Sequence, residues 1–160
     1  MISIRRLDPD KDRTLYKEVF EWEQGYPRWL RDAEKSCGMS LEEFLLVGTL
    51  ERRADVGVFT PELTGMVSVN FDRGSKVFEG HVWAKRGTSL ETLADAILNV
   101  IHCCVKDLGL EGFFVWVVKR NNPIKKLCDM IGCVRDGETV FDGESHGKPI
   151  EWQRWVRLIT

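Results

Sequence analysis

Residues 85–89, with the sequence KRGTS, carry groups that are suited to binding an anion. Two cations, a glycine and two hydroxyl groups stand where a helix is expected to begin. The first turn of a helix has N–H groups without intrahelical partners and the positive end of the helix dipole, so phosphate groups bind there. Thr88 and Glu91 also have capping-box spacing, which requires no ligand. The segment therefore predicts either a phosphate site or a capped helix start.

Glu79 and His81 are a second pair that can do chemistry. They are two residues apart in an expected strand, so their side chains share one face. A carboxylate can accept a proton, and histidine ionises near neutral pH, so either residue is a candidate general base. The alternative is that this is the solvated face of the strand, with Phe78 and Val82 pointing into the core. The sequence leaves both interpretations open.

The cysteines and histidines do not predict a metal site or a disulfide. The five cysteines lack paired spacing, and the three histidines lie far apart in the sequence. Cys128 has helical spacing from Ile124 and Leu127, which favours a packing role for it. No glycine-rich dinucleotide motif, P-loop or nucleophile elbow is found, so those reaction classes lack their motifs.

The N-terminal part predicts one strand and two helices. Residues 2–7 form the strand, and the first helix follows, with Asp8 as its N-cap and Pro9 at its first position. Ser40 and Glu43 match a capping box at the start of the second helix. The segment between these helices is irregular or partly helical and rich in aromatic residues.

In the middle of the chain the hydrophobic period changes from helical to alternating. Three strands are expected at residues 55–60, 65–71 and 76–84, joined by turn-rich connections. The apolar stripe of residues 90–108 then has helical spacing, and Gly109 is the expected stop. This part predicts an antiparallel meander followed by a long helix.

The C-terminal part predicts a central strand, a helix and two further strands. Residues 112–118 are apolar on both faces, the helix starts at Asn122, and the last strands are residues 133–142 and 150–159. The order is β-α-α-β-β-β-α-β-α-β-β. It predicts one α+β domain, residues 1–160, whose mixed and mostly antiparallel sheet of about seven strands has helices on both faces.

Composition limits the class of protein. The chain has 160 residues, of which 43% are hydrophobic and 30% charged, a balance typical of a folded domain with a core. A net charge of −2 does not favour a nucleic-acid or polybasic membrane partner. The sequence also lacks a signal peptide pattern and an apolar run of membrane-spanning length, so we expect a cytoplasmic protein.

The element order and two motifs resemble the GNAT superfamily of acyl-CoA-dependent N-acetyltransferases, over most of the chain. Strand, AKRGTS and long helix resemble its pyrophosphate-binding motif, Q/R-x-x-G-x-G/A. Residues 121–138 resemble its closing pattern, with Gly132 and Cys133 in place of the Gly-Phe pair and Asn121 at the asparagine. The resemblance implies transfer of an acetyl group from acetyl-CoA, as co-substrate, to a primary amine by direct attack in a ternary complex.

The resemblance also implies which residues bind the cofactor. Main-chain groups at the end of the strand would hold the pantetheine arm, and the following loop would hold the diphosphate. The implied cofactor-binding residues are Trp83, Ala84, Arg86, Gly87, Thr88, Ser89 and Asn121. The chain departs from the motif at its two later glycine positions, which are Ser89 and Glu91 here. A glutamate at the second position would repel a nearby phosphate. The alternative is therefore a catalytically degenerate GNAT-like module that still binds CoA.

For catalysis, the resemblance implies a base on the strand before the loop, here Glu79 or His81. The family's tyrosine acid falls on Cys128, whose thiol can protonate a thiolate or simply pack. The acceptor would be a small-molecule or peptide amine, received by the acidic and aromatic segment around Trp22 and Tyr26. Dimers are common in the family, so a homodimer is compatible, with an exposed tryptophan of the last strand in the contact.

Overall fold

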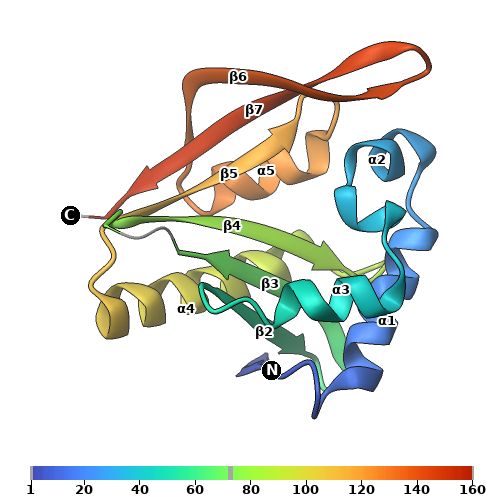
Figure 1. The fold of residues 1–160 in the computed structure, drawn as a ribbon. Coiled ribbons are helices and arrows are strands. Elements are labelled where there is room, and N and C mark those ends of the chain that lie inside the picture. The colour runs from blue at the N-terminus through green and yellow to red at the C-terminus, as the bar shows by residue number, and fades with distance from the viewer. Residues whose placement is uncertain (1, 72–73, 160) are drawn as a thin grey trace.

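A computed structural model describes residues 2–71 and 74–159, and Figure 1 shows its fold. The elements are, in chain order, β1 (Ser3–Arg6), α1 (Arg13–Gln24), α2 (Arg28–Ala33), the 3-10 helix η1 (Lys35–Gly38), α3 (Leu41–Gly48), β2 (Arg53–Phe59), β3 (Leu63–Asn70), β4 (Val77–Ala84), α4 (Leu90–Leu108), β5 (Gly112–Val118), α5 (Asn122–Met130), β6 (Val134–Ser145) and β7 (Lys148–Leu158). The predicted order of strands and helices is confirmed, and the aromatic segment between the first two helices contributes α2 and η1.

The strands form a single mixed sheet in the order β1-β2-β3-β4-β5-β7-β6. Every neighbouring pair is antiparallel except β4 and β5. These two strands pair only where residues 77–79 lie opposite residues 112–114. Beyond that point β4 stays with β3 and β5 stays with β7, so the sheet opens into a V, visible in Figure 1. The predicted sheet is confirmed, and its central opening is the main feature that positions the site.

Helices α4 and α5 cover one face of the sheet. The apolar stripe of α4, which includes Leu93, Ile97 and Ile101, packs on side chains such as Val67 and Phe78. Gly109, with a φ of +66°, ends this helix in the left-handed conformation, as its position predicts. No helix in the described part of the chain combines the length and the apolar character that crossing a membrane requires.

Helices α1 and α3 cover the opposite face. Tyr16 and Val19 of α1 and Phe44 of α3 form a second core cluster with Met66 and Trp83 of the sheet. Phe44 contacts Trp83 edge to face, with ring centroids 5.9 Å apart. Helices therefore lie on both faces, as predicted. The short helices α2 and η1 continue on this second side, and the cavity described below forms there.

The first helix begins later than its sequence predicts. It starts at Arg13 with Asp12 at the N-cap position, so Asp8 is not its N-cap. The Asp8 carboxylate instead accepts the N–H groups of Asp10, at 2.8 Å, and Lys11, at 3.2 Å. Aspartate offers this local turn as an alternative to a helix start, and here the turn forms before the helix.

Candidate active site

Two rows of polar side chains cross β2, β3 and β4 on the face away from α4. The strand register places these residues side by side, and alternation along each strand points them to the same side. The first row is Arg53, Asn70 and Glu79, and the second is Asp55, Ser68 and His81. Such rows exist only because the three strands pair in this register.

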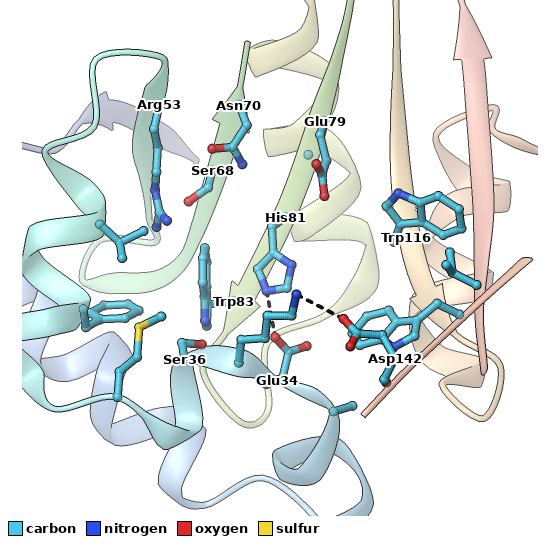
Figure 2. A pocket seen from close by; sticks show the side chains of 18 residues that line it. Glu34, Ser36, Arg53, Ser68, Asn70, Glu79, His81, Trp83, Trp116 and Asp142 are labelled. Atoms are coloured by element: carbon cyan, nitrogen blue, oxygen red, sulfur yellow. Dashed lines mark hydrogen bonds and ion pairs between the residues drawn. The ribbon is translucent and has the colours of Figure 1, made fainter. Parts of the chain in front are cut away.

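These rows form one wall of a cavity of about 440 Å³. Glu34, between α2 and η1, and Ser36 of η1 line it from the side of the N-terminal helices. Trp116 of β5 and Asp142 of β6 line it from the other half of the sheet, as Figure 2 shows. The cavity therefore collects acidic and aromatic side chains from segments far apart in the sequence.

His81 forms an ion pair with a carboxylate that no sequence pattern indicates. Its Nε2 lies 3.2 Å from Glu34 Oε2, and its ring is edge to face with Trp83, with centroids 4.3 Å apart. Burial by itself lowers the pKa of His81, but the charge of Glu34 and the hydrogen bond to it raise the pKa above its usual value. The site thus stabilises the protonated imidazole relative to a histidine in water.

Glu79 lines the same cavity but is differently placed. Its side chain is half-buried, and among the described residues its carboxylate has no ion-pair partner; Figure 2 shows it facing the cavity beyond His81. The alternation along β4 sends Phe78 and Val82 into the core with α4, as expected. The opposite face is nevertheless not simply solvated, because the N-terminal helices and β6 enclose it.

A narrow second cavity, which we call the slot, lies where β4 and β5 diverge. It has a volume of about 30 Å³, and its walls are apolar side chains that include Val115 of β5 and Ile124 of α5. Gly80 and His81 line both this slot and the larger cavity. Alternation along β4 points position 80 toward the slot, and a glycine there adds no side chain to it. An added Cβ at this position would have Val115 as its nearest neighbour, at 3.9 Å.

The 85–89 loop brings exposed cationic and small residues to the start of α4. Lys85, Arg86, Gly87 and Ser89 are exposed, and Gly87 has a φ of +91°, which favours glycine. Thr88 differs from them, because its hydroxyl donates to the Thr64 carbonyl at 3.2 Å. The N–H of Thr88 is also used within the turn. The loop therefore presents four of its five residues to solvent.

The cap of α4 differs from the predicted one. The Ser89 hydroxyl accepts the N–H of Thr92 at 3.1 Å, so the helix begins one residue later than a cap at Thr88 requires. The prediction of a capping box between Thr88 and Glu91 is therefore wrong. Glu91 lies in the first turn and is exposed. An acidic side chain there interacts favourably with the helix dipole, which gives Glu91 a structural role without any ligand.

Two residues at the end of β4 are already contacted by the N-terminal segment. The Ala84 N–H donates to the Tyr26 hydroxyl at 3.5 Å, and the Trp83 indole N–H donates to the buried carboxylate of Glu23. Tyr26 therefore reaches the open side of β4, where the resemblance placed the pantetheine arm. No sequence signal marks this contact, because 58 residues separate the two positions.

Asn121 and Cys128 both belong to α5. Asn121 caps the helix, with its Oδ1 accepting the Ile124 N–H at 3.4 Å. Cys128 is buried with Leu127 in the main core, which confirms the packing interpretation, and it also lines the slot. The hydrogen bond to Cys133, together with burial, raises the pKa of the Cys128 thiol, so it stays protonated.

The residues around Trp22 and Tyr26 that were expected to receive the acceptor do not line the cavity, and a later part of the same segment does. Residues 33–36 line it, whereas Trp22 packs against the α1–α3 core cluster. Of the two tryptophans in the last strand, Trp152 lines the cavity and Trp155 packs against the main core, and neither is exposed. An exposed tryptophan in a subunit contact is therefore not found at either position.

Solved structures share this architecture over nearly the whole chain. A spermidine N-acetyltransferase from Vibrio cholerae in complex with CoA and spermine is 16% identical, with a TM-score of 0.77; the match covers 98% of this chain and 95% of that one. A ribosomal alpha-N-protein acetyltransferase in complex with coenzyme A is 14% identical, covers 99% and 94%, and has a TM-score of 0.77.

A GNAT-family acetyltransferase from Streptococcus pneumoniae is 15% identical, with a TM-score of 0.75 and full coverage of both chains. No sequence model of a protein family matches this chain, and no curated protein sequence matches it. The likeness is thus one of structure and extends over nearly the whole chain. The chain has the fold of the GNAT N-acetyltransferases.

Proposed function

We propose that this protein is an N-acetyltransferase that transfers an acetyl group from acetyl-CoA to a primary amine by direct attack in a ternary complex. The observation that carries the proposal is that the slot between β4 and β5 and the larger cavity share Gly80 and His81 in their linings. A donor arm in one and an amine in the other would bring thioester and nucleophile together beside these two residues, which is the main requirement for a two-substrate transfer.

Acetyl-CoA would lie along the open edge of β4. Its diphosphate would bind at the start of α4, with Arg86 supplying charge and Gly87 and Ser89 allowing close approach. Thr88 would support the loop rather than bind phosphate, since its hydroxyl and N–H already have partners. The pantetheine arm would enter the slot beside β4, where Ala84 lacks a partner strand on the β5 side.

Two assignments from the resemblance, Ala84 and Trp83, need adjustment around that arm. The Tyr26 hydroxyl would either lose its hydrogen bond from the Ala84 N–H when the arm binds, or contact the arm itself. Trp83 would contribute only main-chain groups, because its side chain is buried and bonded to Glu23. Asn121, which caps α5 near the slot, stays a prediction as a cofactor ligand.

The chemistry would use two side chains on the cavity face of β4. Glu79 accepts a proton from the amine as its nitrogen bonds to the acetyl carbon, and the C–S bond breaks as the resulting intermediate collapses. His81, whose protonated form Glu34 stabilises, would give its proton to the leaving thiolate. Cys128 would then pack the slot wall, since a thiol with a raised pKa is a poor proton donor to another thiolate.

The larger cavity suits an amine acceptor. Glu34 pairs with His81 and Asp142 with Lys35, whereas Glu79 has no ion-pair partner among the described residues. The Glu79 carboxylate and the aromatic faces of Trp116 and Trp152 together favour a cation on an apolar body. The similar structure of a spermidine N-acetyltransferase with spermine is a case of this fold with an amine. We propose a small-molecule or peptide amine as the acceptor class.

The second candidate function is a CoA-binding module without turnover, and the exposed Glu91 beside the diphosphate site is the observation that favours it. A transfer assay separates the two. Purified protein is given acetyl-CoA and a panel of primary amines, and thiol release is measured for the wild type, Glu79→Gln and Glu18→Gln. Glu18 is an exposed control on α1.

Under the enzyme proposal, Glu79→Gln lowers kcat by roughly 100-fold or more, while Glu18→Gln matches the wild type. The CoA dissociation constant should be the same in all three proteins. Thiol release from no amine in the panel, with CoA bound at saturation, would contradict the proposal and favour the binding module.

A further inference from the structure

The larger cavity contains a cation that the proposed chemistry does not use. Arg53 of β2 lines it, and its side chain is 9% exposed. Its Nε donates to Asp55 Oδ1 at 2.8 Å, and its guanidinium lies over the Trp83 ring, 5.6 Å from the centroid. Lysine and arginine are rarely buried to this extent without a paired charge or a function.

Asp55 balances the charge of Arg53 but leaves part of the guanidinium without an acceptor. The Asp55 carboxylate also accepts the Tyr16 hydroxyl, at 2.7 Å, and the Ser68 hydroxyl, so its oxygens are shared among three donors. Arg53 Nη2 is buried and has no hydrogen-bond partner among the described residues. A buried charged N–H without an acceptor is destabilising, and an oxygen of a bound ligand would remove that deficit.

Asn70 adds a second donor next to Arg53. The two residues are partners across β2 and β3, and both line the cavity. Glu79 is the next residue in the same row, on β4. Adjacent strands are about 4.8 Å apart, so Arg53 and Glu79 stand roughly 10 Å apart at the backbone. Figure 2 shows Arg53 and Asp142 on opposite sides of His81, and Asp142 pairs with Lys35 at 3.0 Å, so Arg53 is the cation at its end of the cavity.

We propose that the acceptor is an amine that also carries a carboxylate, as a flexible amino acid does. Arg53 and Asn70 bind the carboxylate with charge-assisted hydrogen bonds, and the amine lies at Glu79. The distance across the row favours a chain of several bonds between the two groups. This inference rests on the proposed function, because it assigns the acceptor class for the same cavity.

The test compares three probes with equal carbon chains: ε-aminocaproate, hexylamine and hexamethylenediamine. They share an amine and differ at the far end, which is a carboxylate, a methyl group or a second amine. Their binding to CoA-saturated protein is measured by calorimetry. We expect ε-aminocaproate to bind roughly tenfold more tightly than either of the others, which is the usual effect of a hydrogen bond between charged groups.

Two variants separate recognition from folding. Asn70→Leu leaves the Arg53–Asp55 pair intact, and Arg53→Lys keeps the charge beside Asp55 but loses the planar fork. Each should reduce the preference for ε-aminocaproate over hexylamine by several-fold, while hexylamine binding changes little. Thermal unfolding of each variant shows whether it is folded, and Asn70→Leu alone suffices if Arg53→Lys is not.

The readout keeps the two proposals distinct. Equal binding of the three probes, or tightest binding of hexamethylenediamine, would overturn the carboxylate inference whether or not the protein transfers acetyl groups. Preference for ε-aminocaproate that disappears in Asn70→Leu supports it, even if no thiol is released. In that last case the inference about recognition stands and the proposed transfer reaction fails.

Discussion

The two sides of the proposed site are built in different ways. On the donor side, residues 85–89 and the start of α4 are one continuous stretch, and their exposed groups follow from a loop and a helix cap. On the acceptor side, the cavity takes its lining from the α2–η1 segment, α3 and six strands. The donor side is therefore local in sequence, whereas the acceptor side is a product of strand register and helix docking.

This difference predicts which substitutions should affect ligand binding alone and which should also affect folding stability. A local site can be changed by altering one charge on an exposed loop, with little effect on folding. A site assembled from distant segments shares its side chains with the packing that holds those segments, as Tyr16, Asp55 and Arg53 show. Changes there should therefore alter stability and recognition together.

The largest effect is expected at Gly80, which lines both cavities. Gly80→Leu would put a side chain in the space proposed for the pantetheine arm, so acetyl-CoA binding should weaken by roughly 100-fold or more. Forcing methylenes among packed side chains also destabilises the unliganded fold, typically by about 1–3 kcal/mol, so binding is compared below the lowered midpoint of unfolding. Gly80→Ala is the matched control, since a Cβ there only approaches Val115, at 3.9 Å. Calorimetry with acetyl-CoA checks both, and unchanged affinity in Gly80→Leu would place the arm elsewhere.

The next effect tests the donor side by itself. Ser89→Asp keeps a good N-cap but brings a negative charge to the proposed diphosphate site, so CoA affinity should fall roughly ten- to hundredfold. Ser40→Asp is the same exchange at the N-cap of α3, away from the loop, and should leave CoA binding as it is. A thermal shift titration with CoA measures both, and equal affinities would exclude the α4 start as the phosphate site.

A smaller effect tests how far the acceptor side depends on packing. Tyr16→Phe removes the hydroxyl that donates to Asp55 within the buried network, which should lower the free energy of unfolding by about 1–3 kcal/mol. Tyr26→Phe is the comparison, because its hydroxyl makes a longer contact, at 3.5 Å, and should cost less. Urea unfolding of the two variants provides the measurement. A greater loss in Tyr26→Phe would reverse the assignment of the structural tyrosine.

The smallest effect concerns pH and the pair of His81 and Glu34. Because the pKa of His81 is raised in the folded protein, its contribution to stability is fully present below the unfolded pKa and is lost as pH rises through the folded one. Glu34→Gln should therefore lower the free energy of unfolding more at pH 6 than at pH 9. Urea unfolding at the two pH values checks this. A larger difference at pH 9 would contradict the ion pair.

Much of the fold can be predicted from local sequence patterns, and the errors in that prediction are local too. Apolar periodicity predicts β5 and α4, and Gly109 ends the helix as expected. Where several polar residues compete for one helix start, the sequence does not decide which one caps it. Asp8 forms a turn instead of a cap, and Ser89 takes the role predicted for Thr88.

The sequence by itself determined the order of elements, the exposed basic loop and the shared face of Glu79 and His81, because these depend on spacing along one segment. Only the tertiary structure decided the rest. Glu34 reaches His81, and Arg53 lies in a row with Asn70, because helix docking and strand register bring together residues that no local pattern connects. The divergence of β4 and β5 belongs to this second class, since each strand follows a different partner.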